Sequence, residues 1–279
     1  MRTIDIKQIE NEVSRLCIEA ATYIEADVLA AIKKAKSKEC GLAKSILEQI
    51  IENDELASKE NIPMCQDTGI TIVFVEIGNE VYINGNLEEA INAGVAKGYT
   101  EGYLRKSVVA SPLNRVNTKN NTPAIIHYKY TTGDKLKITV CPKGAGSENM
   151  SKVKMLVPAD GIKGIKKFVV DTIKEAGGRA CPPLVVGVGI GGSLEKCALL
   201  AKEALARDIN DSSSDLDAKK LEDELLLEIN ATNVGPMGLK GKTTALAVKV
   251  NLYPCHIASL PVAVNIQCHA SRHKVVILW

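Results

Sequence analysis

The N-terminal part of the chain carries apolar residues at helical spacing. Apolar side chains recur every three or four positions between residues 5 and 57, for example at Ile9, Val13 and Leu16. Such a stripe is typical of an amphipathic helix. We expect two or three helices in this part, with a break near Cys40-Gly41. Proline and glycine then predict a loop at 61–69.

The middle of the chain changes to the pattern of strands. β-Branched and apolar residues predict strands over 70–77 and 81–83, and a helix should run from Asn86 or Leu87 to about Leu104. The polar stretch 109–122 and the glycine-rich stretch 142–149 read as loops. Residues 124–130 and 135–141 flank Thr132-Gly133-Asp134 and predict a β-hairpin.

The C-terminal half mixes both patterns. Helices are expected over 162–175, 193–207 and 217–230, with a solvated linker at 211–214 between the last two. Strands are expected over 184–188, 244–250 and 262–266. Because helices and strands do not alternate regularly, we predict an α+β fold. Its helical N-terminal part is followed by mixed strands and helices in one domain, residues 1–279.

The composition excludes several classes of function. The net charge of the 279 residues is +2, aromatic residues make up 4%, and basic residues are dispersed, so no nucleic-acid surface is expected. No apolar run reaches the roughly 18 residues that suggest a membrane span. The N-terminus lacks the apolar core of a signal peptide, which favours the cytoplasm. Because the cytoplasm is reducing, the eight cysteines should be thiols that are buried, catalytic or metal-bound rather than disulfides.

The segment Pro63-Met64-Cys65-Gln66-Asp67-Thr68-Gly69 carries the sharpest chemistry. A soft metal ligand is followed by an amide, a carboxylate and a hydroxyl, and then by a glycine that lets the backbone turn. An ordinary Asp-Thr-Gly turn with a buried cysteine explains the pattern equally well. An aspartic protease is excluded, because no second such motif completes a carboxylate pair.

Two glycine-rich segments resemble nucleotide sites and are interpreted otherwise. Gly187, Gly189 and Gly192 fit G-x-G-x-x-G, but the βαβ context is missing, so a turn that allows close strand–helix packing is preferred. Backbone amides at the following helix could also favour an anion. Gly235–Thr243 lacks the first glycine of a phosphate loop, so we expect it to form the wall of a site.

Other candidates leave two interpretations open. Lys143–Asn149 is either an anion-binding nest or a surface turn. Arg105 follows a helical run and could be only a helix-end charge. His256 follows Cys255 and is separated from Cys268 by an apolar strand. Cys181 opens Cys181-Pro182-Pro183. Four further cysteines lie on helical or strand patterns and are expected in the core: Cys17, Cys40, Cys141 and Cys197. The polar residues of the C-terminal tail are expected to be solvated: His269, Arg272 and His273.

Taken together, four motifs resemble the alpha subunit of class I fumarate hydratases and of the similar L-tartrate dehydratases. They are the Cys65 segment, Lys143-Gly144-Ala145-Gly146-Ser147, Ala180-Cys181-Pro182-Pro183 with its glycines, and His256 through Cys268. The resemblance covers nearly the whole chain. It implies a hydro-lyase that interconverts fumarate and (S)-malate, or alternatively acts on L-tartrate.

The resemblance also implies a site. Cys65, Cys181 and Cys268 would hold a [4Fe–4S] cluster whose fourth iron binds substrate and acts as a Lewis acid. Substrate contacts would come from Gln66, Asp67, Arg105, Gly144, Ala145 and His256, with Asp67 and His256 as acid–base or orienting groups. Arg105 would bind one carboxylate of a small dicarboxylate.

The chain departs from the family at two positions and in length. Leu260 stands where one-chain relatives have another cysteine, and Ala145 where relatives often have glycine. The remaining family residues belong to a separate beta subunit, which implies a heterotetramer. A different class stays open, in which a non-catalytic subunit holds structural zinc or senses iron and oxygen, with Cys255 or His256 as the fourth zinc ligand.

Overall fold

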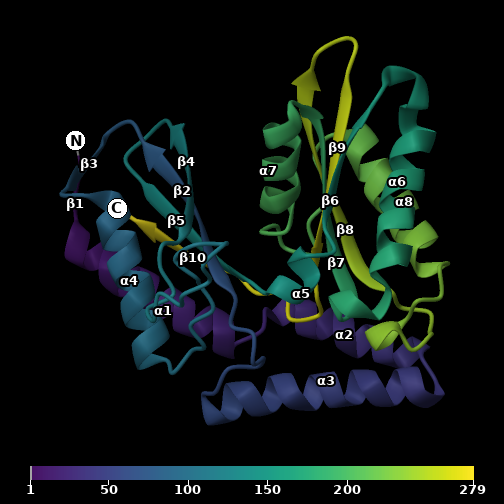
Figure 1. The fold of residues 1–279 in the computed structure, drawn as a ribbon, viewed down its shortest axis with the longest axis horizontal. Helices are drawn as coiled ribbons and strands as arrows, with labels where there is room; N and C mark the ends of the chain where they lie inside the picture. Colours follow the sequence, from purple (N-terminus) through teal and green to yellow (C-terminus); the bar gives the residue numbers. More distant parts are fainter. Residues whose placement is uncertain (1) are drawn as a thin grey trace. The chain divides into compact units, whose positions relative to one another are not determined.

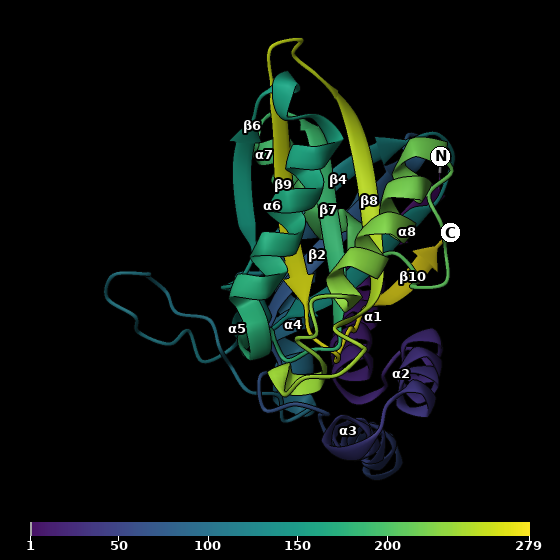
Figure 2. The same ribbon diagram turned by 90° about the vertical axis from the view of Figure 1, so that its right-hand side faces the viewer.

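The computed structural model describes residues 2–279, which divide into two compact units. The first unit comprises residues up to Ile24, Asp54–Ala145 and Arg272–Trp279, and the second comprises Glu25–Asn53 and Gly146–Ser271. Each unit has its own four-stranded sheet and apolar core (Figures 1 and 2). The α+β prediction is confirmed, and the assignment of residues 1–279 to one domain stays a prediction.

Three helices form the N-terminal part, as the pattern predicted. They are α1 (Ile6–Thr22), α2 (Ala26–Lys38) and α3 (Gly41–Glu60), so the second break falls at Glu39 and Cys40. Asp5 caps α1, because its carboxylate accepts a hydrogen bond of 2.7 Å from the backbone N–H of Lys7. The loop expected after α3 is present, since no helix or strand lies between Glu60 and Ile70.

The sheet of the first unit has the order β10-β5-β2-β4. A separate parallel pair joins β1 to β3, and α4 packs against α1. Close packing of these helices depends on glycine, since a Cβ added at Gly94 would lie 2.6 Å from the carbonyl oxygen of Glu10. The bounds are β1 (Arg2–Asp5), β2 (Ile70–Gly78), β3 (Val81–Asn84), α4 (Leu87–Glu101), β4 (Ile125–Thr131), β5 (Leu136–Lys143) and β10 (Lys274–Leu278).

The predicted hairpin of residues 124–130 and 135–141 is wrong. Strand β2 lies between β4 and β5, so that Val73 pairs with Ile126 in parallel and with Val140 in antiparallel orientation. The nine residues of β2 are mostly buried, and their backbone groups need ladder partners on both sides, which outweighs the local turn signal. The turn instead meets β2, whose Gly78 N–H donates to the carbonyl of Lys135 at 2.9 Å.

The sheet of the second unit has the order β6-β9-β7-β8. Helix α7 covers one face, and α6 and α8 cover the other (Figure 1). The sequence pattern missed strands β1, β6 and β10. The bounds are α5 (Ala145–Glu148), β6 (Lys152–Leu156), α6 (Gly161–Ala176), β7 (Leu184–Gly192), α7 (Leu194–Ala204), α8 (Leu216–Asn230), β8 (Ala245–Cys255) and β9 (Leu260–Gln267), with short 3₁₀ turns η1 (Pro158–Asp160), η2 (Gly177–Ala180) and η3 (Pro236–Gly238).

The glycines that resemble a dinucleotide motif lie within β7 rather than in a turn. A Cβ added at Gly187 would lie 2.1 Å from the carbonyl oxygen of Ala201, and one at Gly189 would lie 2.0 Å from that of Cys197. Both oxygens belong to α7, whereas Val186 and Val188 face the core beneath α6 and α8. The expected turn is therefore wrong, and the expected close strand–helix packing is confirmed. Across residues 2–279, no helix combines the length and the apolar character that crossing a membrane requires.

Candidate functional site

The carboxylate of Asp67 is the centre of the candidate site in the first unit. Its Oδ1 atom accepts a hydrogen bond of 3.0 Å from the N–H of Gly69, and its Oδ2 atom accepts one of 2.8 Å from the N–H of Ala145. The side chain stays 26% exposed. Two segments far apart in the sequence, the loop before β2 and the end of β5, are thus joined at one acidic group.

The guanidinium of Arg105 faces this carboxylate. Its Nη2 atom lies 3.6 Å from Oδ1 of Asp67, and half of the Arg105 side chain is exposed. Helix α4 ends at Glu101 and is capped by Gly102, so Arg105 lies outside the last turn of the helix. This position outside the last turn argues against a helix-end charge, and binding of a substrate carboxylate by Arg105 stays a prediction.

Buried polar groups hold the backbone of this loop. The Tyr99 hydroxyl lies 2.8 Å from the Thr68 carbonyl and 3.1 Å from that of Gly69, and burial raises the pKa of Tyr99. Asn121 donates to the Gly69 carbonyl at 3.2 Å. Thr68 donates from its hydroxyl to the carbonyl of Arg105 at 2.8 Å. Sequence analysis missed Tyr99 and Asn121, because a helical tyrosine and a loop asparagine carry no motif.

Two glycines make room at the same place. Gly69 has φ +81°, and a Cβ there would lie 2.7 Å from backbone atoms of Lys143. A Cβ at Gly144 would lie 3.1 Å from Oδ2 of Asp67. The expected nest at 143–149 includes a one-turn helix, α5, and the N–H of Ala145 points at a carboxylate. Gly144 and Ala145 therefore lie beside Asp67, and Gln66 is exposed next to it.

Arg272 joins this group and corrects an interpretation of the C-terminal tail. The tail residues were read as solvated, but Arg272 is only 4% exposed and His273 only 8%. The Nη2 atom of Arg272 donates to the main-chain carbonyl of Asp67. The interpretation failed because the short strand β10, which follows these residues, pairs with β5 and carries them into the unit.

In the second unit, Cys181 and Cys268 come from neighbouring loops. Strands β7 and β9 are antiparallel, with Val185 opposite Gln267, so the start of β7 and the end of β9 share one end of the sheet. The N–H of His269 donates to the carbonyl of Cys181 at 3.2 Å. Cys181 has φ 53°, a left-handed conformation that is uncommon outside glycine and is found disproportionately at functional sites.

The glycine-rich loop at 235–241 packs against the turn before Cys181. A Cβ added at Gly238 would lie 2.4 Å from the Cα of Gly178, and Met237 donates its N–H to the carbonyl of Pro182 at 2.8 Å. The expectation that this loop forms the wall of a site stays a prediction.

The three candidate cluster ligands differ from the core cysteines. Cys65, Cys181 and Cys268 are partly exposed thiols. Cys17 and Cys197 are buried as expected, whereas Cys141 is half-buried and Cys40 is exposed, so the core interpretation of Cys40 is wrong, because it lies at the break between α2 and α3. Burial raises the pKa of the Cys17 thiol to about 12, which disfavours a metal-binding thiolate. Cys65 lies in the first unit and the other two lie in the second. Within residues 2–279, no three His, Cys, Asp or Glu side chains form a group that could hold a single metal ion. The exposure and loop settings of the three thiols fit cluster ligands, whereas Cys17 does not.

His256 lies at the opposite end of the second unit's sheet from Cys268. It occupies the exposed hairpin between β8 and β9, which stands at the top of Figure 1. Strand β9 has 8 residues. At about 3.3 Å per residue, this strand alone spans roughly 26 Å. Cys255 shares the hairpin, so neither Cys255 nor His256 can complete a zinc site with Cys181 and Cys268 of the same chain.

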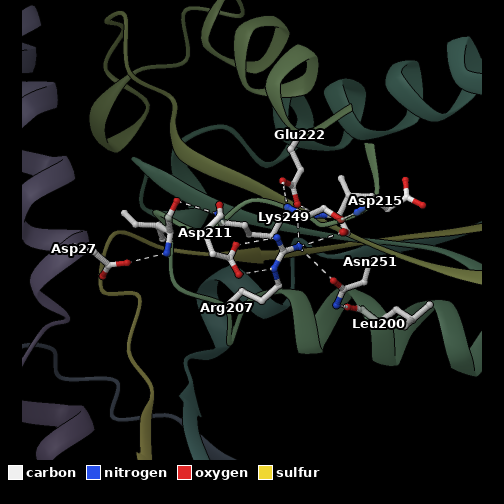
Figure 3. A network of polar contacts seen from close by, with 11 residues as sticks. Asp27, Leu200, Arg207, Asp211, Asp215, Glu222, Lys249 and Asn251 are labelled. Atoms are coloured by element: carbon white, nitrogen blue, oxygen red, sulfur yellow. Dashed lines mark hydrogen bonds and ion pairs between the residues drawn. The ribbon is translucent and has the colours of Figure 1, made fainter. Parts of the chain in front are cut away.

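A second polar cluster in the second unit is structural (Figure 3). Arg207 contacts Glu222 at 2.9 Å and Asp211 at 2.8 Å, and Lys249 contacts Asp211 at 3.1 Å. Glu222 also accepts the N–H of Val250 at 2.8 Å. These ion pairs attach the connection between α7 and α8 to strand β8. Burial alone would lower the pKa of Arg207. The hydrogen bonds to Asp211 and the negative charge of Glu222 outweigh this effect, so the pKa of Arg207 is raised.

The comparisons with known proteins identify the family of the chain. Residues 10–277 match the family described as fumarate hydratase (Fumerase). The chain belongs to this family. Since the family consists of hydro-lyases, the predicted family and enzyme class are confirmed.

Curated members of the fumarate hydratase family cover the chain almost from end to end. A protein of Methanocaldococcus jannaschii named putative L(+)-tartrate dehydratase subunit alpha is 45% identical over 276 residues, which is 96% of either chain. The L(+)-tartrate dehydratase subunit alpha of Escherichia coli O157:H7 is 31% identical, over 92% of this chain and 86% of its own. That of Escherichia coli K12 is 30% identical over the same shares.

Proposed function

We propose that this chain is the cluster-bearing alpha subunit of a two-subunit hydro-lyase that interconverts fumarate and (S)-malate. One observation carries the proposal: a half-exposed guanidinium, Arg105, lies 3.6 Å from the carboxylate of Asp67 in a chain of this family. A cation that can bind a substrate carboxylate thus stands beside a group that can accept a proton.

Three cysteines would be the cofactor ligands in this proposal. Cys65, Cys181 and Cys268 would hold a [4Fe–4S] cluster, since all three are partly exposed thiols on loops. When bound, the cluster supplies an iron that acts as a Lewis acid on the substrate hydroxyl. The left-handed backbone at Cys181 and the hydrogen bond from His269 orient one of these loops.

Polar residues of the first unit would bind the substrate. Arg105 would bind one carboxylate, and Gln66 with the backbone at Gly144 and Ala145 would line the site. Asp67 would accept or return the proton at the carbon next to the departing hydroxyl. Its two hydrogen bonds from backbone N–H groups hold the carboxylate in one orientation.

His256 would serve a neighbouring active site. Because β9 separates it from Cys268, it cannot contact a substrate held at Cys181 and Cys268 of its own chain. A second copy of the chain can present its exposed hairpin to that site. We therefore assign His256 to the site of a second alpha chain, which agrees with a heterotetramer of two alpha and two beta subunits.

The beta subunit would complete the site. The relatives are named as alpha subunits, which implies a partner chain. The first unit offers Arg105 for one carboxylate, and the beta chain would bind the other and enclose the reaction. The second candidate substrate is L-tartrate, which the names of the relatives favour. We propose that the enzyme acts in the cytoplasm.

The proposal is tested by anaerobic co-expression with the beta chain. Iron, sulfide and visible absorption are measured first, followed by activity with fumarate, malate, mesaconate and L-tartrate. We expect a brown protein that hydrates fumarate only when the beta chain is present. A higher kcat/KM for L-tartrate would select the second substrate. A colourless zinc protein without lyase activity would contradict the proposal.

A further inference from the structure

Arg272 is a buried cation whose hydrogen-bonding capacity is mostly unused. The residue is 4% exposed, and its Nε and Nη1 atoms are buried without a hydrogen-bond partner among residues 2–279. Its Nη2 atom donates to a neutral group, the main-chain carbonyl of Asp67. A buried charge without a charged partner is destabilising, so an unpaired guanidinium lowers the stability of the fold.

The acidic group beside Arg272 is already occupied. Oxygens of Asp67 accept the N–H groups of Gly69 and Ala145, and Arg105 approaches Oδ1. Gly144 separates the two side chains: a Cβ added there would lie 3.1 Å from Oδ2 of Asp67 and 4.0 Å from Nη2 of Arg272. A second positive charge therefore stands next to the carboxylate without forming an ion pair with it.

A neutral side chain could make the one hydrogen bond that Arg272 makes. Glutamine would donate to the Asp67 carbonyl without burying a charge, and a methionine of similar length would fill the space. What only arginine or lysine adds is positive charge at the loop that carries Cys65, Gln66 and Asp67. Folding of the unit gives no reason to keep that charge.

We propose that Arg272 is a positioning residue of the candidate site, which holds the backbone of Asp67 and places positive charge beside its carboxylate at the expense of stability. The inference rests on the proposed function, because it assigns the charge to the reaction at Asp67. Arg272 itself does not touch the substrate. Its loss should therefore lower kcat and leave KM nearly unchanged, whereas a substrate-binding residue would raise KM.

The test compares Arg272→Gln with Arg207→Gln, the same substitution at a half-buried arginine that is paired with the carboxylates of Asp211 and Glu222. Urea unfolding is measured on the metal-free alpha chain, so this part is independent of any activity. Arg272→Gln should unfold at the same or a higher urea concentration than the wild type, and Arg207→Gln at a lower one. Arg272→Met serves as a second variant with the same expectation.

Activity is then measured per iron in the complex with the beta chain, on whichever substrate the wild type turns over. Arg272→Gln should lower kcat by about 10- to 100-fold, the range for residues that orient a catalytic group, and Arg272→Lys should recover part of it. Earlier unfolding of Arg272→Gln and Arg272→Met, or an unchanged kcat, would overturn the inference. If the wild type turns over none of the substrates, the proposed function fails, and the unfolding comparison still decides whether Arg272 burdens stability.

Discussion

The Nη2 atom of Arg105 lies 3.6 Å from Oδ1 of Asp67, beyond the range of a direct hydrogen bond. The pair is held from the backbone side, since Thr68 donates to the carbonyl of Arg105 at 2.8 Å. A half-exposed guanidinium at this distance keeps its donors available for an incoming carboxylate. The contact therefore orients Arg105 without saturating it.

Arg105→Lys should raise KM while leaving the iron content intact. An ammonium cannot form the two parallel hydrogen bonds that a guanidinium makes to a carboxylate. Loss of one charged hydrogen bond, ~1.5–3 kcal/mol, corresponds to an increase in KM of about 10- to 100-fold. Steady-state kinetics of the iron-loaded complex measure this change in KM. Arg115→Lys, in the exposed loop, is the control. Unchanged kinetics in Arg105→Lys would show that Arg105 does not bind the substrate.

Serine substitution of each candidate ligand should remove the cluster. Cys65→Ser, Cys181→Ser and Cys268→Ser should each lose the iron-dependent absorption and the activity, because a neutral hydroxyl replaces a thiolate ligand. Cys40→Ser and Cys255→Ser are suitable controls, since both cysteines are exposed. Cys17→Ser is a poor control, because it places a hydroxyl in a fully buried site. Full iron content in Cys181→Ser would remove it from the ligand set.

The sequence was most informative where chemistry and a turn coincide. The family resemblance assigned the Cys65 to Gly69 segment and the glycines near Lys143 to one site, and the structure joins them through Asp67 and Ala145. The helices at 5–57 were also predictable, because their apolar spacing is a local property. The helices depend on residues close to one another in the chain, whereas the contact between Asp67 and Ala145 joins segments that are far apart in it.

Long-range pairing was beyond the local patterns. The turn at Gly133 indicated a hairpin, but β2 lies between its arms, because pairing partners are decided by the whole sheet. Arg272 looked solvated, since a charged residue in a short polar stretch is usually exposed. Its burial follows from the pairing of β10 with β5, which no local pattern predicts.

Glu222→Ala should destabilise the second unit strongly. Glu222 is 6% exposed and accepts hydrogen bonds from Arg207 and from the N–H of Val250. Its removal leaves the buried N–H of Val250 without this acceptor and takes one of two carboxylates from Arg207, which still contacts Asp211, a change that costs about 1–3 kcal/mol. Urea unfolding followed by circular dichroism measures the shift. Glu224→Ala on the same helix removes a surface pair with Lys166 and should leave the midpoint nearly unchanged. Equal midpoints for the two variants would contradict the structural role of the cluster.

The position of His256 predicts that two defective alpha chains can complement each other. His256→Ala keeps the cluster ligands but lacks the hairpin histidine, and Cys181→Ser keeps the histidine but cannot hold the cluster. If the histidine acts within its own chain, every combination of the two variants is inactive. If it acts on a neighbouring chain, the mixed enzyme has one complete site, made of the cluster of the first variant and the histidine of the second.

The two variants are co-expressed with different affinity tags and with the beta chain, and the doubly tagged complex is purified without oxygen. Each variant alone should be inactive, and the mixed complex should show about half of the wild-type kcat, because one of two symmetric sites is restored. A complex of wild-type and Cys181→Ser alpha chains sets the level expected for one cluster. An inactive mixed complex with normal iron in the His256→Ala chain would place His256 within its own chain's site. Full activity of His256→Ala alone would remove His256 from the reaction.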